Sequence, residues 1–423
     1  MSAEPSDIAA AVRQQALSLV LPVREGQGER LAELLRERRR AVQQALRRVT
    51  TLHFGRFVVL PPEHGAAAPH QLAFESNFDG ELGPHLDELC HALGPLLDEI
   101  FGSCECSASS SRRSEFKEFV VRESLRANAF YAAHPGLSLK VIHNDRALRR
   151  AAERYLAERQ RAGDLGSQGA LALARELQAH VLGVAATADG LYVGSVERWL
   201  PAVSGGALAV ALARPLQFLW AFLLAPIFEL RDRFVARNVS DAAEIRRRRD
   251  EIGLDEDRLQ QNALTHLVAI KPGRYRYAVL RLMLRIADAL ATVGAQESRL
   301  GSLETIHFAR WLILPDRRLL FLSNYDGSWE AYLGDFIDKA SKGLTMIWTN
   351  TRLFPKTRLL LWQGAADEEA FKRWTRSHQL PTQIWYTAYP DLSVADVLDN
   401  ARLRELLASD LDETRARTLL GVL

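Results

Sequence analysis

The chain has 423 residues, of which 48% are hydrophobic and 25% are charged, and its formal net charge is +2. This composition is typical of a folded protein and lacks the signature of a disordered chain. Because the net charge is small and basic residues are mixed with acidic ones, a basic nucleic-acid-binding protein is excluded and no nucleic acid is expected as a partner. The length predicts two or three domains, or one duplicated domain with an insert.

Cysteine usage and the N-terminus indicate the compartment. The chain has three cysteines, Cys90, Cys104 and Cys106, a sparse and odd set that fits a reducing environment better than a disulfide framework. Their spacing with His91 does not follow a standard zinc pattern, so no metal site is expected. The first residues show no basic segment followed by an apolar core, which argues against a signal peptide. We therefore expect a cytoplasmic location.

Two segments of the chain are nearly the same. HFGRFVVL at 53–60 and HFARWLIL at 307–314 share a histidine and an arginine at matching positions. Each is followed by a second apolar run and then by a polar cluster, SNFDG at 76–80 or SNYDG at 323–327. Further matches keep the same order, LVLPVREG against HLVAIKPG upstream and AFYAAHPG against IWYTAYPD downstream. This agreement predicts a duplicated unit.

Hydrophobic periodicity predicts the same order of elements in both copies. The first copy has an apolar strand, a helix over 29–48, a hairpin of strands over 53–60 and 72–76, and a helix over 82–100; the second has its helices over 275–290 and 329–348. A further short helix and a strand complete each copy. This is the ferredoxin-like order, whose sheet has helices on one face and leaves the other face uncovered.

We therefore predict an α+β fold in which two ferredoxin-like units bring their uncovered faces together as a pseudo-dimeric α+β barrel. The predicted domains are a first half with a short N-terminal extension over 1–160, a helical apolar insert over 161–262, and a second half over 263–423.

The predicted insert contains the stretch ALAVALARPLQFLWAFLLAPIF over 207–228, apolar apart from Arg214 and Gln217. It is long enough to span a bilayer, but Arg214 costs about 3 kcal/mol in hydrocarbon, and Pro215 and Pro226 interrupt the helix. Three interpretations stay open: a buried hairpin between domains, a peripheral contact with the inner face of the membrane, and a full span. The membrane interpretations make lipid or a hydrophobic small molecule the partner.

Candidate catalytic residues lie on the matched hairpins. Strand alternation places Arg310 and Arg56 on apolar faces. A buried arginine needs an acidic partner, and the sequence favours Asp326 for Arg310 and Asp79 for Arg56. Each pair either ties the hairpin to the next helix or faces a cavity, where the arginine would stabilise negative charge and the aspartate would move a proton.

The histidines that begin the matched strands, His53 and His307, are candidates to bind a cofactor or substrate. The alternative is a hydrogen-bonded histidine of the core. Alternation places His307 on the face opposite Arg310, together with Ala309 and Trp311.

The Asp-Gly turns also have a structural explanation. Asp326 is placed to cap the helix that begins near Ser328, Gly327 to supply an unusual φ, and Asn324 to bond to its own backbone. Because a turn required by the fold must recur in both copies, the duplication favours this structural role.

The duplicated arrangement resembles the dimeric α+β barrel superfamily, which includes dye-decolorising peroxidases, chlorite dismutases and small monooxygenases. The peroxidases carry a Gly-x-x-Asp-Gly motif whose aspartate works with an arginine beside a haem. Here the pattern is Ser323-x-x-Asp326-Gly327 with Arg310 available, so the first glycine is missing. The resemblance implies a haem-dependent oxidoreductase that acts on a hydrophobic substrate near a membrane. Its catalytic residues would be Arg310, Asp326, Arg56 and Asp79. The motif itself places no haem histidine, and His307 and His53 are the candidates because they recur at the strand starts.

The stretches HFARW, SNYDGSWE and DFIDK also resemble the signature of an uncharacterised bacterial family with two ferredoxin-like halves, which implies no activity. The alternative function is a non-catalytic membrane-associated binding or scaffold protein whose repeated motif is architectural.

Overall fold

The computed structural model describes residues 8–63, 68–163, 169–187, 191–197, 215–232, 242–253, 256, 259–297 and 305–423. The chain forms two compact units, each assembled from separated segments. The larger unit comprises Gln15–Ala133 and Pro201–Pro390, and the smaller comprises Met1–Gln14, His134–Leu200 and Asp391–Leu423.

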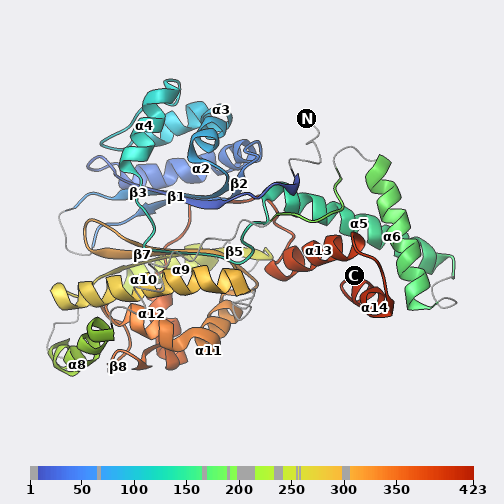
Figure 1. Cartoon of the computed structure of the whole chain (residues 1–423). Coiled ribbons are helices and arrows are strands. Elements are labelled where there is room, and N and C mark those ends of the chain that lie inside the picture. The colour runs from blue at the N-terminus through green and yellow to red at the C-terminus, as the bar shows by residue number, and fades with distance from the viewer. Residues whose placement is uncertain are drawn as a thin grey trace. The chain divides into compact units, whose positions relative to one another are not determined.

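The larger unit contains two four-stranded antiparallel sheets, which confirms the predicted mixed α+β class (Figure 1). The first sheet has the order β1 (Gln14–Pro22), β3 (Gln71–Asp79), β2 (Leu52–Leu60) and β10 (Ile384–Thr387). The second has the order β4 (Ala129–Ala132), β6 (Ile306–Ile313), β7 (Arg318–Asp326) and β5 (Gln261–Ala269). A small separate hairpin consists of β8 (Thr357–Arg358) and β9 (Trp362–Gln363).

Helices cover the outer face of each sheet (Figure 1). Those over the first sheet are α2 (Gly28–Leu46), α3 (Leu82–Phe101) and α4 (Arg113–Glu123). Those over the second are α10 (Arg274–Glu297), α11 (Trp329–Trp348) and α12 (Glu368–His378). These bounds confirm the order of helices and hairpin predicted for both copies, and α11 covers the predicted 329–348.

The two sheets face each other across an apolar layer. On β2, Phe57 and Val59 belong to the core beneath the helices, whereas Val58 and Leu60 belong to the layer shared with the second sheet. The alternation along this strand follows from the two-residue period of a pleated strand, and it makes both faces of β2 buried. The second sheet adds its own residues to the shared layer, namely Leu267, Leu312, Leu314, Leu320 and Leu322.

The last strand of each half belongs to the sheet of the other half. β10 pairs antiparallel with β2, which places Trp385 opposite Arg56. β4 pairs antiparallel with β6, which places Phe130 opposite Arg310. Each half therefore supplies three strands to its own sheet and one strand to the other, an exchange that the order of elements along the chain did not indicate.

The helices of the predicted insert are divided between the two units. α6 (Ala170–Thr187) belongs to the smaller unit, whereas α8 (Pro215–Asp232) and α9 (Ala242–Gly253) belong to the larger one. α8 buries Ala221 and Ala225 in the core of the second sheet. Within the described residues, no helix has both the length and the apolar character needed to cross a bilayer. Residues 207–214 of the predicted membrane contact lie outside the described residues.

The smaller unit is helical. It combines α6 with α5 (Leu139–Arg161), α13 (Val394–Leu407) and α14 (Glu413–Gly421) around one apolar core. A buried ion pair joins two of these helices, with Arg404 Nε 2.8 Å from Asp145 Oδ1. Burial raises the pKa of Asp145 to about 6, although Arg404 opposes that rise.

His85 shows how the two copies fill one position differently. Its ring stacks on Phe78 at 4.1 Å, and its nitrogens lie 2.8 Å from Thr51 Oγ1 and 3.0 Å from Ser76 Oγ. The second copy has Tyr332 at this position. Its ring stacks on that of Tyr325, and the ring centroids are again 4.1 Å apart. Burial lowers the pKa of His85 to about 3, so the folded protein holds this side chain neutral.

We expect His85 to make the protein less stable in acid. Below pH 6.5 the unfolded chain binds a proton at His85 that the folded chain does not, so the free energy of unfolding falls as the pH drops from about 6.5 towards 3. The slope from this group is roughly 1.4 kcal/mol per pH unit. His85→Tyr, which copies Tyr332, removes that term. Urea unfolding of the wild type and of the variant at pH 7 and at pH 4.5 measures the free energy of unfolding of each. If both lose the same amount between these two pH values, the acid sensitivity does not come from His85.

Candidate functional site

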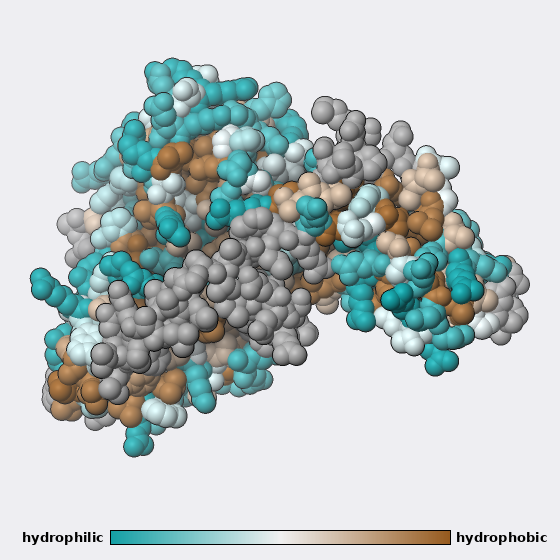
Figure 2. Space-filling model, viewed as in Figure 1, coloured by the Kyte–Doolittle hydropathy of each residue, from teal (hydrophilic) through white to brown (hydrophobic). Residues whose placement is uncertain are grey.

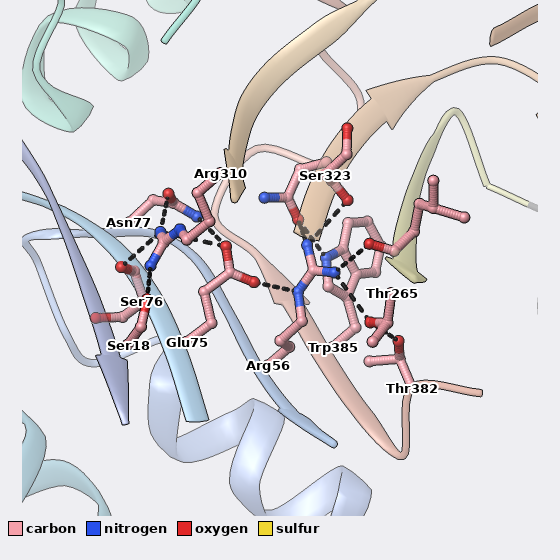
Figure 3. Close-up of polar contacts among 12 residues, drawn as sticks. Ser18, Arg56, Glu75, Ser76, Asn77, Thr265, Arg310, Ser323, Thr382 and Trp385 are labelled. Carbon is pink, nitrogen blue, oxygen red and sulfur yellow. Dashed lines mark hydrogen bonds and ion pairs between the residues drawn. The ribbon is translucent and has the colours of Figure 1, made fainter. Parts of the chain in front are cut away.

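The side chain of Arg56, on β2 of the first sheet, extends to the second sheet and forms hydrogen bonds there (Figure 3). Its Nη1 donates to the carbonyl oxygen of Leu264 at 2.9 Å and to Thr265 Oγ1 at 3.3 Å. Its Nη2 donates to the carbonyl oxygen of Ser323 at 2.9 Å and to Asn324 Oδ1 at 2.6 Å. The residue is 1% exposed, so these protein acceptors replace the water that the guanidinium group loses on folding.

Arg310 makes the same contacts in the opposite direction. Its Nη1 donates to the carbonyl oxygen of Leu17 at 2.7 Å and to Ser18 Oγ at 2.8 Å. Its Nη2 donates to the carbonyl oxygen of Ser76 at 3.1 Å and to Asn77 Oδ1. All four acceptors stand at positions that match the four acceptors of Arg56, so the duplicated sequence builds this contact twice.

One carboxylate lies between the two guanidinium groups (Figure 3). Glu75 Oε2 forms an ion pair with Arg56 Nε, and Glu75 Oε1 lies 3.2 Å from Arg310 Nη2. The second copy has Leu322 at the matching position, so two buried cations share a single anion. Burial lowers the pKa of both arginines, to about 10 for Arg310, and Glu75 opposes the change in each. We call Arg56, Glu75 and Arg310 the arginine cluster.

The acidic partners predicted for the arginines are wrong. Neither arginine pairs with the aspartate of its own hairpin; Asp79 Oδ1 lies 2.9 Å from His53 Nε2, and Asp326 Oδ1 lies 2.8 Å from His307 Nε2. The prediction considered one hairpin at a time, whereas each arginine extends across to the opposite sheet. The structure therefore separates the predicted Arg and Asp pairs and brings together His and Asp pairs.

A β-bulge sets the orientation of each histidine. The pairing of β2 with β3 shifts register at His53, and that of β6 with β7 shifts at His307. A bulge adds one residue to a strand and interrupts its alternation. For this reason His307 does not share a face with Ala309 and Trp311 as predicted, and its ring packs instead at 5.2 Å from Phe54 of the other sheet.

Tyr389 packs against both histidines. Its hydroxyl lies 3.1 Å from His53 Nδ1, and its ring centroid lies 5.8 Å from that of His53 and 5.7 Å from that of His307. Burial raises the pKa of this phenol well above its ordinary value, and the charges of Asp79 and Asp326 add to the rise. The tyrosine therefore stays neutral. We call His53, Asp79, His307, Asp326 and Tyr389 the histidine cluster.

The histidine cluster does not fit the haem that the resemblance implies. His53 uses one ring nitrogen for Tyr389 and the other for Asp79, and His307 Nε2 lies within 2.8 Å of Asp326. Both imidazoles are 0% exposed, and phenylalanine rings pack against them at 5.4 and 5.2 Å. A haem ligand needs a ring nitrogen directed at the iron and room for the macrocycle beside it, and these neighbours occupy that space.

In the Asp-Gly turns, the role predicted for glycine is confirmed and the capping role predicted for Asp326 is wrong. Gly80 and Gly327 adopt φ of 80° and 75°, as the turn requires of glycine. Asp326 does not cap α11, because the N-cap is Ser328, whose side chain accepts from the backbone nitrogen of Ala331. The aspartate is thereby left to bond with His307.

Two important residues escaped the sequence prediction. Glu75 had a detectable signal, because a carboxylate stands inside an apolar run where the second copy has Leu322. Tyr389 had none, since it follows a short strand far from either histidine in sequence and reaches them only through the strand exchange.

Among the described residues, no arrangement of side chains is suited to metal binding or to thiol chemistry. No group of three or more His, Cys, Asp or Glu side chains there is placed to hold a metal ion. Cys90 and Cys104 are buried free thiols, and burial raises the pKa of Cys104 to about 12, which disfavours the reactive thiolate.

Comparison with known proteins assigns the chain to no family. No family model matches it, and no curated protein matches it either.

We expect Glu75→Leu to destabilise the protein by about 3 to 5 kcal/mol, because it leaves two buried guanidinium groups without their anion. Guanidinium chloride unfolding measures the change. The matched control is Glu63→Gln, which removes a half-exposed partner of Arg352 at 2.7 Å and is expected to cost under about 1 kcal/mol. Equal effects of the two substitutions would contradict a central role for Glu75.

Proposed function

We propose that this protein is a non-catalytic, membrane-associated binding or scaffold protein, built as a pseudo-dimeric barrel from two ferredoxin-like halves. The matched motifs are architectural in this proposal. The arginine cluster supports it, because each guanidinium group is buried and bonded to the opposite half. The histidine cluster supports it as well, because its members bond to one another inside the core.

The observation that carries the proposal is an exposed apolar face on α8. Four large hydrophobic residues recur there at spacings of three, four and three, which places them on one side of a helix. They are Trp220 (43% exposed), Leu223 (66%), Ile227 (63%) and Leu230 (54%), which we call the apolar stripe. Figure 2 shows hydrophobic side chains gathered over this helix. A contiguous exposed apolar patch indicates an interaction surface.

α8 packs against α10 and the segment 359–360, and the residues of the apolar stripe are exposed. Phe228 stacks on Tyr275 at 4.0 Å. Glu229 accepts from the backbone nitrogens of Leu359 and Leu360 at 3.1 and 3.0 Å. One face of the helix is buried in the core, and in this proposal the exposed face binds a membrane surface. An apolar face on a fixed helix suits monotopic binding in one leaflet.

We expect Leu223→Gln with Ile227→Gln to weaken binding to phospholipid vesicles by about 10-fold or more, because two apolar side chains no longer enter the hydrocarbon boundary. Vesicle flotation measures the bound fraction, and the melting temperature shows that the fold is kept. The control is Val121→Gln, which changes an equally exposed residue (58%) on α4. Unchanged binding in the double variant would overturn the assignment of this face.

The competing function is the haem-dependent oxidoreductase implied by the resemblance. We expect protein produced with a haem precursor to show no Soret band, because the space beside both histidines is filled. An absorbance spectrum of the wild type and of His307→Ala decides the question. A Soret band in the wild type that disappears in the variant would establish haem binding and end the non-catalytic proposal.

A further inference from the structure

The two copies differ in charge at the start of their first helix. α2 has Glu29 in its first turn, the sign of charge that a helix N-terminus favours. α10 has no acidic residue in its first turn and carries Arg274 and Arg276, with Arg276 at the position that matches Glu29. Cations at this end of a helix are unfavourable, so Arg274 and Arg276 lower the stability of the first turn of α10 and make it positively charged.

Beside this turn, the carboxylate of Asp232 forms ion pairs with two cations. Asp232, the last residue of α8, has Oδ2 2.5 Å from Arg276 Nη2 and 3.0 Å from Lys271 Nζ. Among the described residues it is the acidic group in ion-pair contact with either cation. Burial, and after it the neighbouring Arg276, lowers the pKa of Lys271 to about 8, while Asp232 and Glu229 oppose the shift.

Arg276 has hydrogen-bonding capacity that the described protein does not use. It is 1% exposed, yet its Nε and Nη1 have no hydrogen-bond partner. Buried donors without acceptors are costly, and a buried cation that lacks a full counter-charge is more so. In the arginine cluster, by comparison, both Nη atoms of Arg56 and of Arg310 donate to protein oxygens.

The loop before α10 adds further donors at the surface. Arg231 donates to the carbonyl oxygen of Pro272 and Arg317 to that of Gly273, both at 3.2 Å. Gly273 has φ of 104°, and Arg274 is exposed. The first N–H groups of an α-helix have no partner within the helix and bind anions readily. The loop, the first turn and their arginines together form a cationic surface that begins at Arg231, one residue after the apolar stripe ends.

We propose that the start of α10, with Lys271, Arg274 and the buried charge of Arg276, binds the phosphate group of an anionic phospholipid. The inference rests on the proposed membrane function and names its ligand. A lipid suits the site better than a free anion because the cationic surface begins at Arg231, next to Leu230 at the end of the apolar stripe. The headgroup phosphate then lies at the cationic surface while the stripe lies at the hydrocarbon boundary.

The test is flotation with vesicles of phosphatidylcholine alone and of phosphatidylcholine mixed with phosphatidylglycerol. The variant is Lys271→Gln with Arg274→Gln, and Arg274→Gln alone provides a second variant at an exposed position. The matched control is Arg24→Gln, at the position of the first copy that corresponds to Lys271. We expect the double variant to lose about 30-fold in binding to the anionic vesicles, since each of the two cations near the surface contributes about 1 kcal/mol. Its binding to phosphatidylcholine alone, which depends on the apolar stripe, is expected to stay at the wild-type level.

The possible results separate this inference from the function on which it rests. If the double variant and the control bind anionic vesicles as the wild type does, the phosphate site is overturned and the apolar stripe stands. If the wild type binds neither kind of vesicle, the membrane function itself fails. If inorganic phosphate raises the melting temperature of the wild type but not of the double variant, and vesicles stay unbound, the ligand is a free anion and the lipid assignment is overturned.

Discussion

The arginine cluster joins the two halves of the larger unit through one shared carboxylate. A guanidinium group removed from water needs acceptors for its donors and an anion for its charge. Arg56 and Arg310 find the acceptors on the opposite half and the anion in Glu75. Because hydrogen bonds are directional, these contacts are satisfied only when one sheet lies over the other in a single register. The apolar layer between the sheets supplies burial without such a restriction.

The strand exchange depends on the same contacts. β10 brings Trp385 beside Arg56, and its Nε1 donates at 3.0 Å to Asn324 Oδ1, the atom that also accepts from Arg56. β4 brings Phe130 beside Arg310, with the guanidinium carbon 5.6 Å from the ring centroid. An aromatic residue of each exchanged strand therefore packs beside the arginine of the sheet that it joins. Strand pairing and the arginine contacts therefore join the same two halves.

Differences between the copies separate architecture from function. The two arginines of the inter-sheet contact and their acceptors stand at matching positions in both copies. Glu75 is an exception, since Leu322 stands at the matching position of the second copy. Two further differences lie at α8 and α10. Glu29 is replaced by Arg276, and the apolar stripe of α8 adjoins the second half, where it has no counterpart in the described part of the first.

The sequence by itself determined the duplication, the order of elements and the burial of Arg56 and Arg310, because these follow from local periodicity and from comparing the chain with itself. It also placed glycine correctly in both hairpin turns, where backbone geometry is a local property. Only the tertiary structure decided that Glu75 is the partner of the arginines, that each histidine bonds to an aspartate, and that the last strands are exchanged. The arginine contacts between the sheets join residues more than 200 positions apart, the exchanged strands pair with distant segments, and the histidine contacts depend on a bulge that shifts alternation by one residue; none of these leaves a periodic signal in the chain.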